Sequence, residues 1–271
     1  MRTRTRSVRS HLRLLSACLC AASGLWLAAA CSSDPKRPVT GAADADKFLY
    51  EQGVASVEDK KWLKGREYFR EIVDNYPQSS YRADAKLGIG DTYLGENSIE
   101  AKVLAINEFR EFLSYFPNHP RADYAQYRLG LAHFRQMLNP ERDQTETRAA
   151  IDEFETFLVQ YPGSEFAGEV RKLLRESKDR LGESDYRVGL FYYRVKWYPG
   201  AIDRFKGLLG RDPEFTNRDA VYFHLAESLI KVNKAAEALP YFERLLAEFE
   251  KSRYLEQTKR RVAELKAGHG N

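Results

Sequence analysis

Residues 150–162 read Ala-Ile-Asp-Glu-Phe-Glu-Thr-Phe-Leu-Val-Gln-Tyr-Pro, and the pattern of this stretch decides the fold. A small residue at Ala150, an aromatic at Phe154 and the apolar pair 157–158 stand at i, i+4, i+7 and i+8, which is one face of a helix. Pro162 then ends the helix, because proline cannot continue its backbone hydrogen bonds. The stretch therefore predicts a short helix that packs through one apolar face.

The same frame of small residue, aromatic and stop recurs along the chain. The copies are Gly65/Phe69/Pro77, Ala105/Phe109/Pro117, Ala150/Phe154/Pro162, Ala201/Phe205/Pro213 and Ala238/Phe242, the last with Glu250 in place of proline. Small residues that could admit the aromatics precede each frame, at Gly53, Gly90, Gly130, Gly189 and Ala226. This periodicity resembles the tetratricopeptide repeat over residues 45–250. The sequence therefore predicts an all-α fold, a tetratricopeptide-repeat solenoid of about five helix pairs.

The spacing between the stops exceeds the ideal repeat, which predicts insertions. Apolar residues at helical spacing over 166–181 predict one extra helix before repeat four, and fusion through Gly182 into the next helix is left open. Residues 139–147 are polar and lack apolar periodicity, so they predict a loop. We expect repeats one to three within 45–165, the extra helix with repeats four and five within 166–266, and a tail at 267–271.

The N-terminal residues predict export. Residues 1–30 carry five arginines and no acid, followed by an apolar run and small residues before Cys31, as in a secretory signal. The segment resembles a bacterial lipoprotein box, which implies lipidation of Cys31 and a flexible tether over 31–44. The leucine that the box prefers three residues before the cysteine is Ala28 here, and Leu27 stands one residue further back. A plain secretory signal with an incidental cysteine is the alternative.

Charge and cysteine usage exclude several classes of protein. The chain has a formal net charge of +4, but without residues 1–30 it has 38 basic and 39 acidic side chains, a net charge of −1. Nucleic-acid binding, which needs a basic face, is not expected. The cysteines stand at 18, 20 and 31, so no disulfide is expected in the folded repeats.

No arrangement of residues predicts catalysis, a metal site or a cofactor. The five histidines are scattered, without the i, i+4 pairing of a metal site, and no phosphate-binding loop or nucleophile elbow occurs. We therefore expect a protein that is not an enzyme. The alternative, an enzyme hidden in the loop at 139–147, would have Glu141, Asp143 and Glu146 without a partner base or nucleophile.

Binding is the remaining class of function. First helices of stacked pairs line a concave surface, and aromatics there suit an extended peptide. The residues expected to face this groove are Tyr50, Leu87, Tyr124, Tyr127, Phe134, Tyr186, Tyr193 and Phe223. Packing between adjacent repeats is the competing interpretation for each of them.

Several short motifs narrow the resemblance to one family. They are Tyr76-Pro77-Gln78-Ser79, Asn118-His119-Pro120, Asp123-Tyr124, Tyr127-Arg128-Leu129-Gly130-Leu131, Tyr161-Pro162-Gly163-Ser164 and Lys178-Asp179-Arg180-Leu181. With the lipoprotein signal, this combination resembles the BamD (YfiO) family, lipoproteins of the machine that folds β-barrel proteins into the outer membrane. The resemblance implies a protein anchored to the outer membrane by its N-terminal lipid and facing the periplasm.

The same resemblance implies partners and contact residues. The N-terminal repeats would bind targeting segments of unfolded outer-membrane proteins, and the C-terminal repeats would dock on the last POTRA domain of a BamA-like barrel subunit. Tyr192 and Arg204 match positions implicated in that docking, although the Trp197-Tyr198-Pro199 turn between them departs from better-studied members. A solvated charge is the competing interpretation of Arg204. A repeat lipoprotein of another envelope machine, serving pilus or secretin assembly or cell-wall coordination, is the alternative function.

Overall fold

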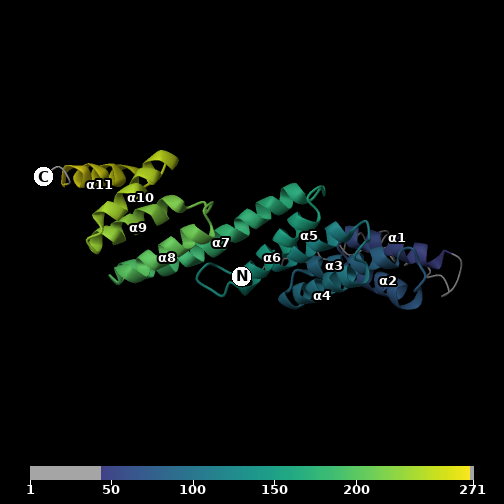
Figure 1. The fold of residues 1–271 in the computed structure, drawn as a ribbon. Coiled ribbons are helices and arrows are strands. Elements are labelled where there is room, and N and C mark those ends of the chain that lie inside the picture. The colour runs from purple at the N-terminus through teal and green to yellow at the C-terminus, as the bar shows by residue number, and fades with distance from the viewer. Residues whose placement is uncertain (1–43, 269–271) are drawn as a thin grey trace, which may run out of the picture. The chain divides into compact units, whose positions relative to one another are not determined.

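The computed structural model describes residues 44–268, and within them the chain forms eleven α-helices and no strand. The helices are α1 (Ala45–Glu58), α2 (Trp62–Asn75), α3 (Arg82–Glu96), α4 (Ile99–Tyr115), α5 (Ala122–Phe134), α6 (Thr145–Gln160), α7 (Ala167–Arg194), α8 (Tyr198–Arg211), α9 (Arg218–Lys231), α10 (Ala235–Glu248) and α11 (Leu255–Gly268). Each helix packs against the next, and first helices of neighbouring pairs also meet, α1 with α3, α3 with α5, α5 with α7 and α7 with α9 (Figure 1). The predicted solenoid of five helix pairs is confirmed.

The second helix of every pair follows the predicted frame. Each of these helices, α2, α4, α6, α8 and α10, ends two residues before its predicted stop. The frame aromatics are almost completely buried, with exposed fractions of 2% or less. The first member of each following apolar pair is also buried, whereas the second is only half-buried. A single apolar stripe therefore fixes which face of each second helix points inward.

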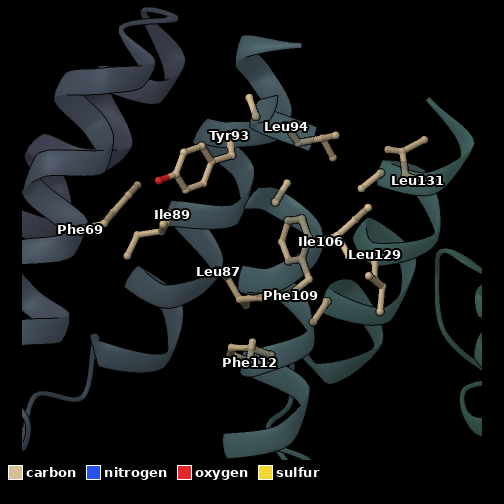
Figure 2. Packing of buried hydrophobic residues seen from close by; sticks show 14 of the residues in the cluster. Phe69, Leu87, Ile89, Tyr93, Leu94, Ile106, Phe109, Phe112, Leu129 and Leu131 are labelled. Atoms are coloured by element: carbon tan, nitrogen blue, oxygen red, sulfur yellow. The ribbon is translucent and has the colours of Figure 1, made fainter. Parts of the chain in front are cut away.

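The small residues of the first helices admit the frame aromatics, as the sequence predicts. A Cβ atom added to Gly90 on α3 would lie 2.6 Å from Cε1 of Phe109, and one added to Gly130 on α5 would lie 2.6 Å from Cε1 of Phe154. Gly53 and Gly189 meet Phe69 and Phe205 at 2.5 Å in the same way. Figure 2 shows Phe109 in the middle of this packing, with Leu87 on one side and Leu129 on the other. Close approach, rather than turn geometry, is what requires glycine here.

The long helix α7 joins two separate hydrophobic clusters. The extra helix and the first helix of repeat four are one continuous element, because Gly182 does not interrupt the helix. A Cβ at Gly182 would lie 2.6 Å from Cδ2 of Phe215, so a close contact explains this glycine. Val170 and Leu173 belong to the cluster of repeats one to three, whereas Tyr186 belongs to that of repeats four and five.

The polar insertion predicted at 139–147 braces α7. Its last three residues are helical, because α6 already begins at Thr145. Arg180 of α7 donates a hydrogen bond of 2.9 Å to the carbonyl oxygen of Leu138, and Arg187 of α7 forms an ion pair with Glu141. The insertion therefore contacts α7 at Arg187, and the residue just before the insertion contacts α7 at Arg180, between the two clusters.

A recurrent polar contact ties each pair to the next. A side chain in the turn that leaves a pair bonds an aspartate in the first helix of that pair. The contacts are Ser79–Asp46 (2.6 Å), Arg121–Asp84 (2.9 Å), Ser164–Asp123 (2.6 Å), Thr216–Asp179 (2.7 Å) and Ser252–Asp219 (2.6 Å). Hydrogen bonds to a carboxylate are stronger than neutral ones, so they fix the position of the next helix. The serines of the Tyr-Pro-x-Ser motifs thus have a structural role.

The C-terminal helix α11 was not anticipated as an element of its own. It packs on α10, and Arg261 of α11 forms an ion pair with Glu227 of α9. Its outward side chains, such as Glu256, Lys259 and Arg260, are exposed and charged. Across residues 44–268 there is no helix with the length and apolarity of a membrane span.

Candidate functional site

The expected groove residues divide into buried and half-buried side chains. Leu87 is completely buried in the core around Phe109, so its assignment to an open groove is wrong. Its helix α3 contacts α1, α2, α4 and α5, which leaves little free surface on its apolar side. Tyr50, Tyr124 and Tyr127 remain half-buried.

Two of these tyrosines stack on a ring of the following repeat. The ring of Tyr50 lies 4.9 Å from that of Tyr81, and the ring of Tyr127 lies 5.1 Å from that of Phe166 at an interplanar angle of 4°. The third such stack, Phe223 on Tyr254 at 4.5 Å, has the same positions in repeat five. We call the recurrent polar contact between the turn and the aspartate of the first helix the clasp. Each stack joins the ring four residues after the aspartate of a clasp to the ring two residues after its serine. This joint spacing is a sequence signal that could have revealed the stacks.

Tyr124 is the centre of a charged network between repeats two and three. Its hydroxyl donates a 2.8 Å hydrogen bond to Asp91, which also forms a 2.6 Å ion pair with Arg128. The guanidinium of Arg121 lies 4.6 Å from the centre of the Tyr124 ring. Burial, and then the charge of Asp91, raises the pKa of Tyr124, so the hydroxyl stays protonated and acts as a donor.

The remaining predicted groove residues also contact repeat cores. Phe134 lies 6.3 Å from Phe154, and it is half-buried. Tyr186 and Phe223 are only 5% exposed, while Tyr193 is half-buried beside His224. Ring surface accessible to a peptide is thus confined to the edges of the half-buried aromatics.

The structure brings Tyr192 and Arg204 together in one hollow. The hollow has a volume of about 370 Å³ and lies where the turn between α7 and α8 folds back. Its lining also includes Trp197, Gly200, Asp203 and Arg211. Lys196 takes the left-handed conformation with φ 61°, and the amide of Trp197 donates a 2.9 Å hydrogen bond to the carbonyl oxygen of Tyr192, which closes the turn.

Exposed aromatic rings lie in and beside this hollow. Trp197 packs edge-on against Tyr192, with ring centres 4.6 Å apart, and covers Gly200, yet it remains 54% exposed. Phe191 is 59% exposed and lies 5.7 Å from the Tyr192 ring. Sequence reasoning noted Trp197 only as a departure from the family pattern and did not assign it a contact.

The charged side chains of this hollow differ in whether they form ion pairs with other residues of the chain. Arg211 forms a 2.7 Å ion pair with Asp185. The exposed Arg204 makes neither an ion pair nor a hydrogen bond within residues 44–268, and the same holds for the side chain of Asp203. An unpaired arginine beside exposed aromatic rings is typical of the central part of a protein interface.

Two further expectations concern lipidation and metal binding. Cys31 lies outside the described residues. In the described part of the chain, no three His, Cys, Asp or Glu side chains are grouped so that they could hold a metal ion. The carboxylates proposed for a loop enzyme make structural contacts instead, since Glu141 pairs with Arg187 and Glu146 lies 2.7 Å from Nδ1 of His133.

Comparison with known proteins identifies the family. A family model described as an outer membrane lipoprotein, YfiO, matches residues 42–233, and a tetratricopeptide-repeat model matches residues 220–252. The chain belongs to the YfiO family. The clasp and stacking residues of repeats one to four, and the hollow with Tyr192 and Arg204, all lie within the matched region.

Relatives of this YfiO-family chain carry a common description. An outer membrane protein assembly factor BamD of Caulobacter vibrioides is 27% identical over 78% of this chain and 68% of its own length. One of Vibrio cholerae is 25% identical over 61% of this chain and 72% of its own. Among solved structures, the TPR2AB domain of yeast Sti1 in a complex with pHSP90 has a TM-score of 0.43 at 12% identity, covering 82% of this chain and 98% of that one.

Proposed function

We propose that this chain is a non-enzymatic lipoprotein of the outer membrane that faces the periplasm and takes part in the assembly of outer-membrane β-barrel proteins. The observation that carries this is the family match over residues 42–233, together with relatives described as outer membrane protein assembly factors. Solenoids of this kind bind other proteins through large surfaces, which suits a role in assembly.

In this proposal two surfaces bind two different partners. The hollow with Tyr192 and Arg204 docks on the POTRA-containing barrel subunit, since it combines exposed rings with a cation that has no partner within residues 44–268. The half-buried rings of Tyr50, Tyr124, Tyr127 and Phe134 bind segments of unfolded outer-membrane proteins. The first surface belongs to repeat four and the second to repeats one to three, so the two contacts can be tested separately.

Arg204→Glu tests the docking contact. Reversal opposes like charges across an interface in which loss of one charged partner already costs about 2–5 kcal/mol, so co-purification with the barrel subunit should fall at least tenfold. Arg244→Glu on α10 is the matched control, because Arg244 is also exposed and has no ion pair within residues 44–268. Wild-type recovery of the barrel subunit by Arg204→Glu, at equal helicity, would show that docking uses another surface.

Tyr124→Ala with Tyr127→Ala tests the peptide contact. The double variant should lose binding of an unfolded barrel-protein peptide in fluorescence anisotropy while keeping the barrel subunit. Phe166→Ala is the control, because it removes the same Tyr127 stack from the other side. If Phe166→Ala abolishes peptide binding equally and melts at the same temperature as the double variant, the rings act by holding the repeats together.

Cys31→Ala tests the anchor. The variant should leave the outer-membrane fraction for the soluble periplasm, because acyl chains on the cysteine supply the membrane affinity. Mass spectrometry of the wild type should find the lipid on Cys31. An unmodified cysteine together with unchanged fractionation of the variant contradicts the lipoprotein assignment and favours the plain secretory signal.

A further inference from the structure

A second hollow lies at the other end of repeat four, away from the turn with Trp197. It has a volume of about 410 Å³, which is within the usual range for ligand pockets. It is lined by Glu183, Tyr186, Asn217, Asp219, Ala220, Lys251, Ser252, Arg253 and Tyr254. These residues come from α7, the start of α9 and the turn that leads into α11.

The hollow lies in one of two repeats that lack a stacked ring at the position four residues after the aspartate of the recurrent polar contact, the other being repeat two with Gly88. The position four residues after the clasping aspartate holds Tyr50, Tyr127 and Phe223 in repeats one, three and five. In repeat four the clasping aspartate is Asp179, and the equivalent position is Glu183. Glu183 forms part of the wall of the hollow, together with Tyr186 and Tyr254.

The acids of this hollow already have partners. Glu183 accepts a 2.8 Å hydrogen bond from Nε of Arg187, and Asp219 accepts one of 2.6 Å from the hydroxyl of Ser252. Burial raises the pKa of Glu183, while the ion pair with Arg187 keeps its carboxylate in contact with a cation.

The two cations of the hollow, in contrast, form no ion pair within residues 44–268. Arg253 bonds only the neutral hydroxyl of Tyr254 and lies 4.7 Å from the centre of that ring. Lys251 makes no ion pair or hydrogen bond with any residue in 44–268. Both side chains are exposed at the rim. The hollow therefore presents two cations without an ion-pair partner in the described part of the chain.

A third hollow adjoins the second, so that the two together form one elongated site. It has a volume of about 540 Å³ and shares Asn217, Asp219, Lys251 and Ser252 with the second. Its remaining lining includes Glu248 and Glu250, so it holds three acids and Lys251, whereas the second hollow holds two acids and two cations. A single small anion would use only the second hollow, beside Lys251 and Arg253, whereas an extended polypeptide can occupy both the second and the third.

We propose that Lys251 and Arg253 bind a carboxylate of an extended polypeptide, whose preceding residues pass through the acidic hollow beside Glu248 and Glu250. Ammonium and guanidinium groups form strong charge-assisted hydrogen bonds with carboxylates, and Tyr186 and Tyr254 supply ring surface beside them. The site is a third binding surface, distinct from the hollow with Arg204 and from the rings of repeats one to three. It does not depend on the identity of the barrel subunit.

Fluorescence anisotropy with three labelled peptides tests this site on the full mature chain. The first is Gly-Lys-Gly-Ser-Tyr-Gly-Ser-Phe with a free C-terminal carboxylate, the second is its C-terminal amide, and the third is the amide with Glu in place of the last serine. The free acid should bind at least tenfold more tightly than the plain amide. Binding of the third peptide as tightly as the free acid assigns the site to acidic side chains, and weak binding of the third assigns it to chain termini.

The variant Lys251→Ala with Arg253→Ala should weaken binding of the free acid at least tenfold and leave the plain amide unchanged. Arg260→Ala is the control, because Arg260 is an exposed cation of α11 that does not line either hollow. Both variants should melt like the wild type, since neither rim side chain is buried. Unchanged binding of the free acid by the double variant, equal binding of all three peptides, or no binding of either carboxylate peptide overturns the proposal.

Discussion

Gly90→Ala places one methyl group against a completely buried ring of repeat two, that of Phe109. The new Cβ would lie 2.6 Å from Cε1 and 2.8 Å from Cζ of Phe109, well inside ordinary carbon contact distance. The ring cannot withdraw easily, because Phe109 is completely buried and Leu87 and Phe112 beside it are buried too. Either the ring or helix α3 must shift by several tenths of an ångström in a close-packed core.

The expected free-energy change has two opposing parts. Alanine in place of glycine favours the helix by about 1 kcal/mol. Overpacking costs about 1–3 kcal/mol, so Gly90→Ala should range from neutral to about 2 kcal/mol less stable. Phe109→Leu shortens the side chain that meets the methyl group. The double variant should therefore be more stable than the sum of the two single changes predicts, by about 1–3 kcal/mol.

Urea unfolding followed by circular dichroism at 222 nm measures this cycle. Gly168→Ala is the matched control, since Gly168 is also a helical glycine but has no atom of a neighbouring side chain within 4 Å of the position that a Cβ would take. It should gain a few tenths to about 1 kcal/mol from helix propensity alone. If Gly90→Ala is as stabilising as Gly168→Ala and the double-mutant cycle shows no coupling, the close contact between Gly90 and Phe109 does not constrain the core.

Two further predictions concern the polar contacts. Ser164→Ala removes the 2.6 Å hydrogen bond to Asp123 and should lower the free energy of unfolding by about 1–3 kcal/mol, because a bond to a charged acceptor is lost. Ser114→Ala is the control, since Ser114 is an exposed helical serine. Equal melting temperatures of the two variants would contradict a stabilising role for the Ser164–Asp123 contact. Burial lowers the pKa of His224, so the unfolded chain binds a proton that the folded chain disfavours, and stability should fall as pH falls below about 6.5. His224→Gln should therefore lose less free energy of unfolding than the wild type between pH 7 and pH 5, and identical pH profiles would show that this histidine does not contribute.

The second helices could be predicted closely because their signal is local. Each has one buried stripe, and the residue after it that ends the helix is visible in the same short segment. The glycines opposite the aromatics were also predictable, since a ring of fixed size needs a partner without a side chain. Both features follow from helix geometry and volume alone.

The first helices could not be predicted to the same depth. α9, for example, buries an almost unbroken run of side chains from Ala220 to Leu229, because it contacts α7, α8 and α10. A helix covered on several sides shows no single apolar stripe, so the sequence does not reveal which side chains face outward. The wrong assignment of Leu87 arose in this way. The proximity of Tyr192 and Arg204 likewise depends on the turn at Lys196, and no sequence motif predicts the left-handed conformation of this residue.

The division of the core explains why one chain can carry several binding surfaces. The apolar clusters of repeats one to three and of repeats four and five are separate, and α7 is the element that contributes to both. Between Leu173 and Tyr186 this helix buries Ser177, whose hydroxyl donates to the carbonyl oxygen of Leu173, rather than a large apolar side chain. Because solenoid stability is a sum over repeats and their neighbours, a change in one cluster reaches the other mainly through α7. The rings of repeats one to three and the two hollows at repeat four therefore rest on different cores, and selection could alter one surface without destabilising the others.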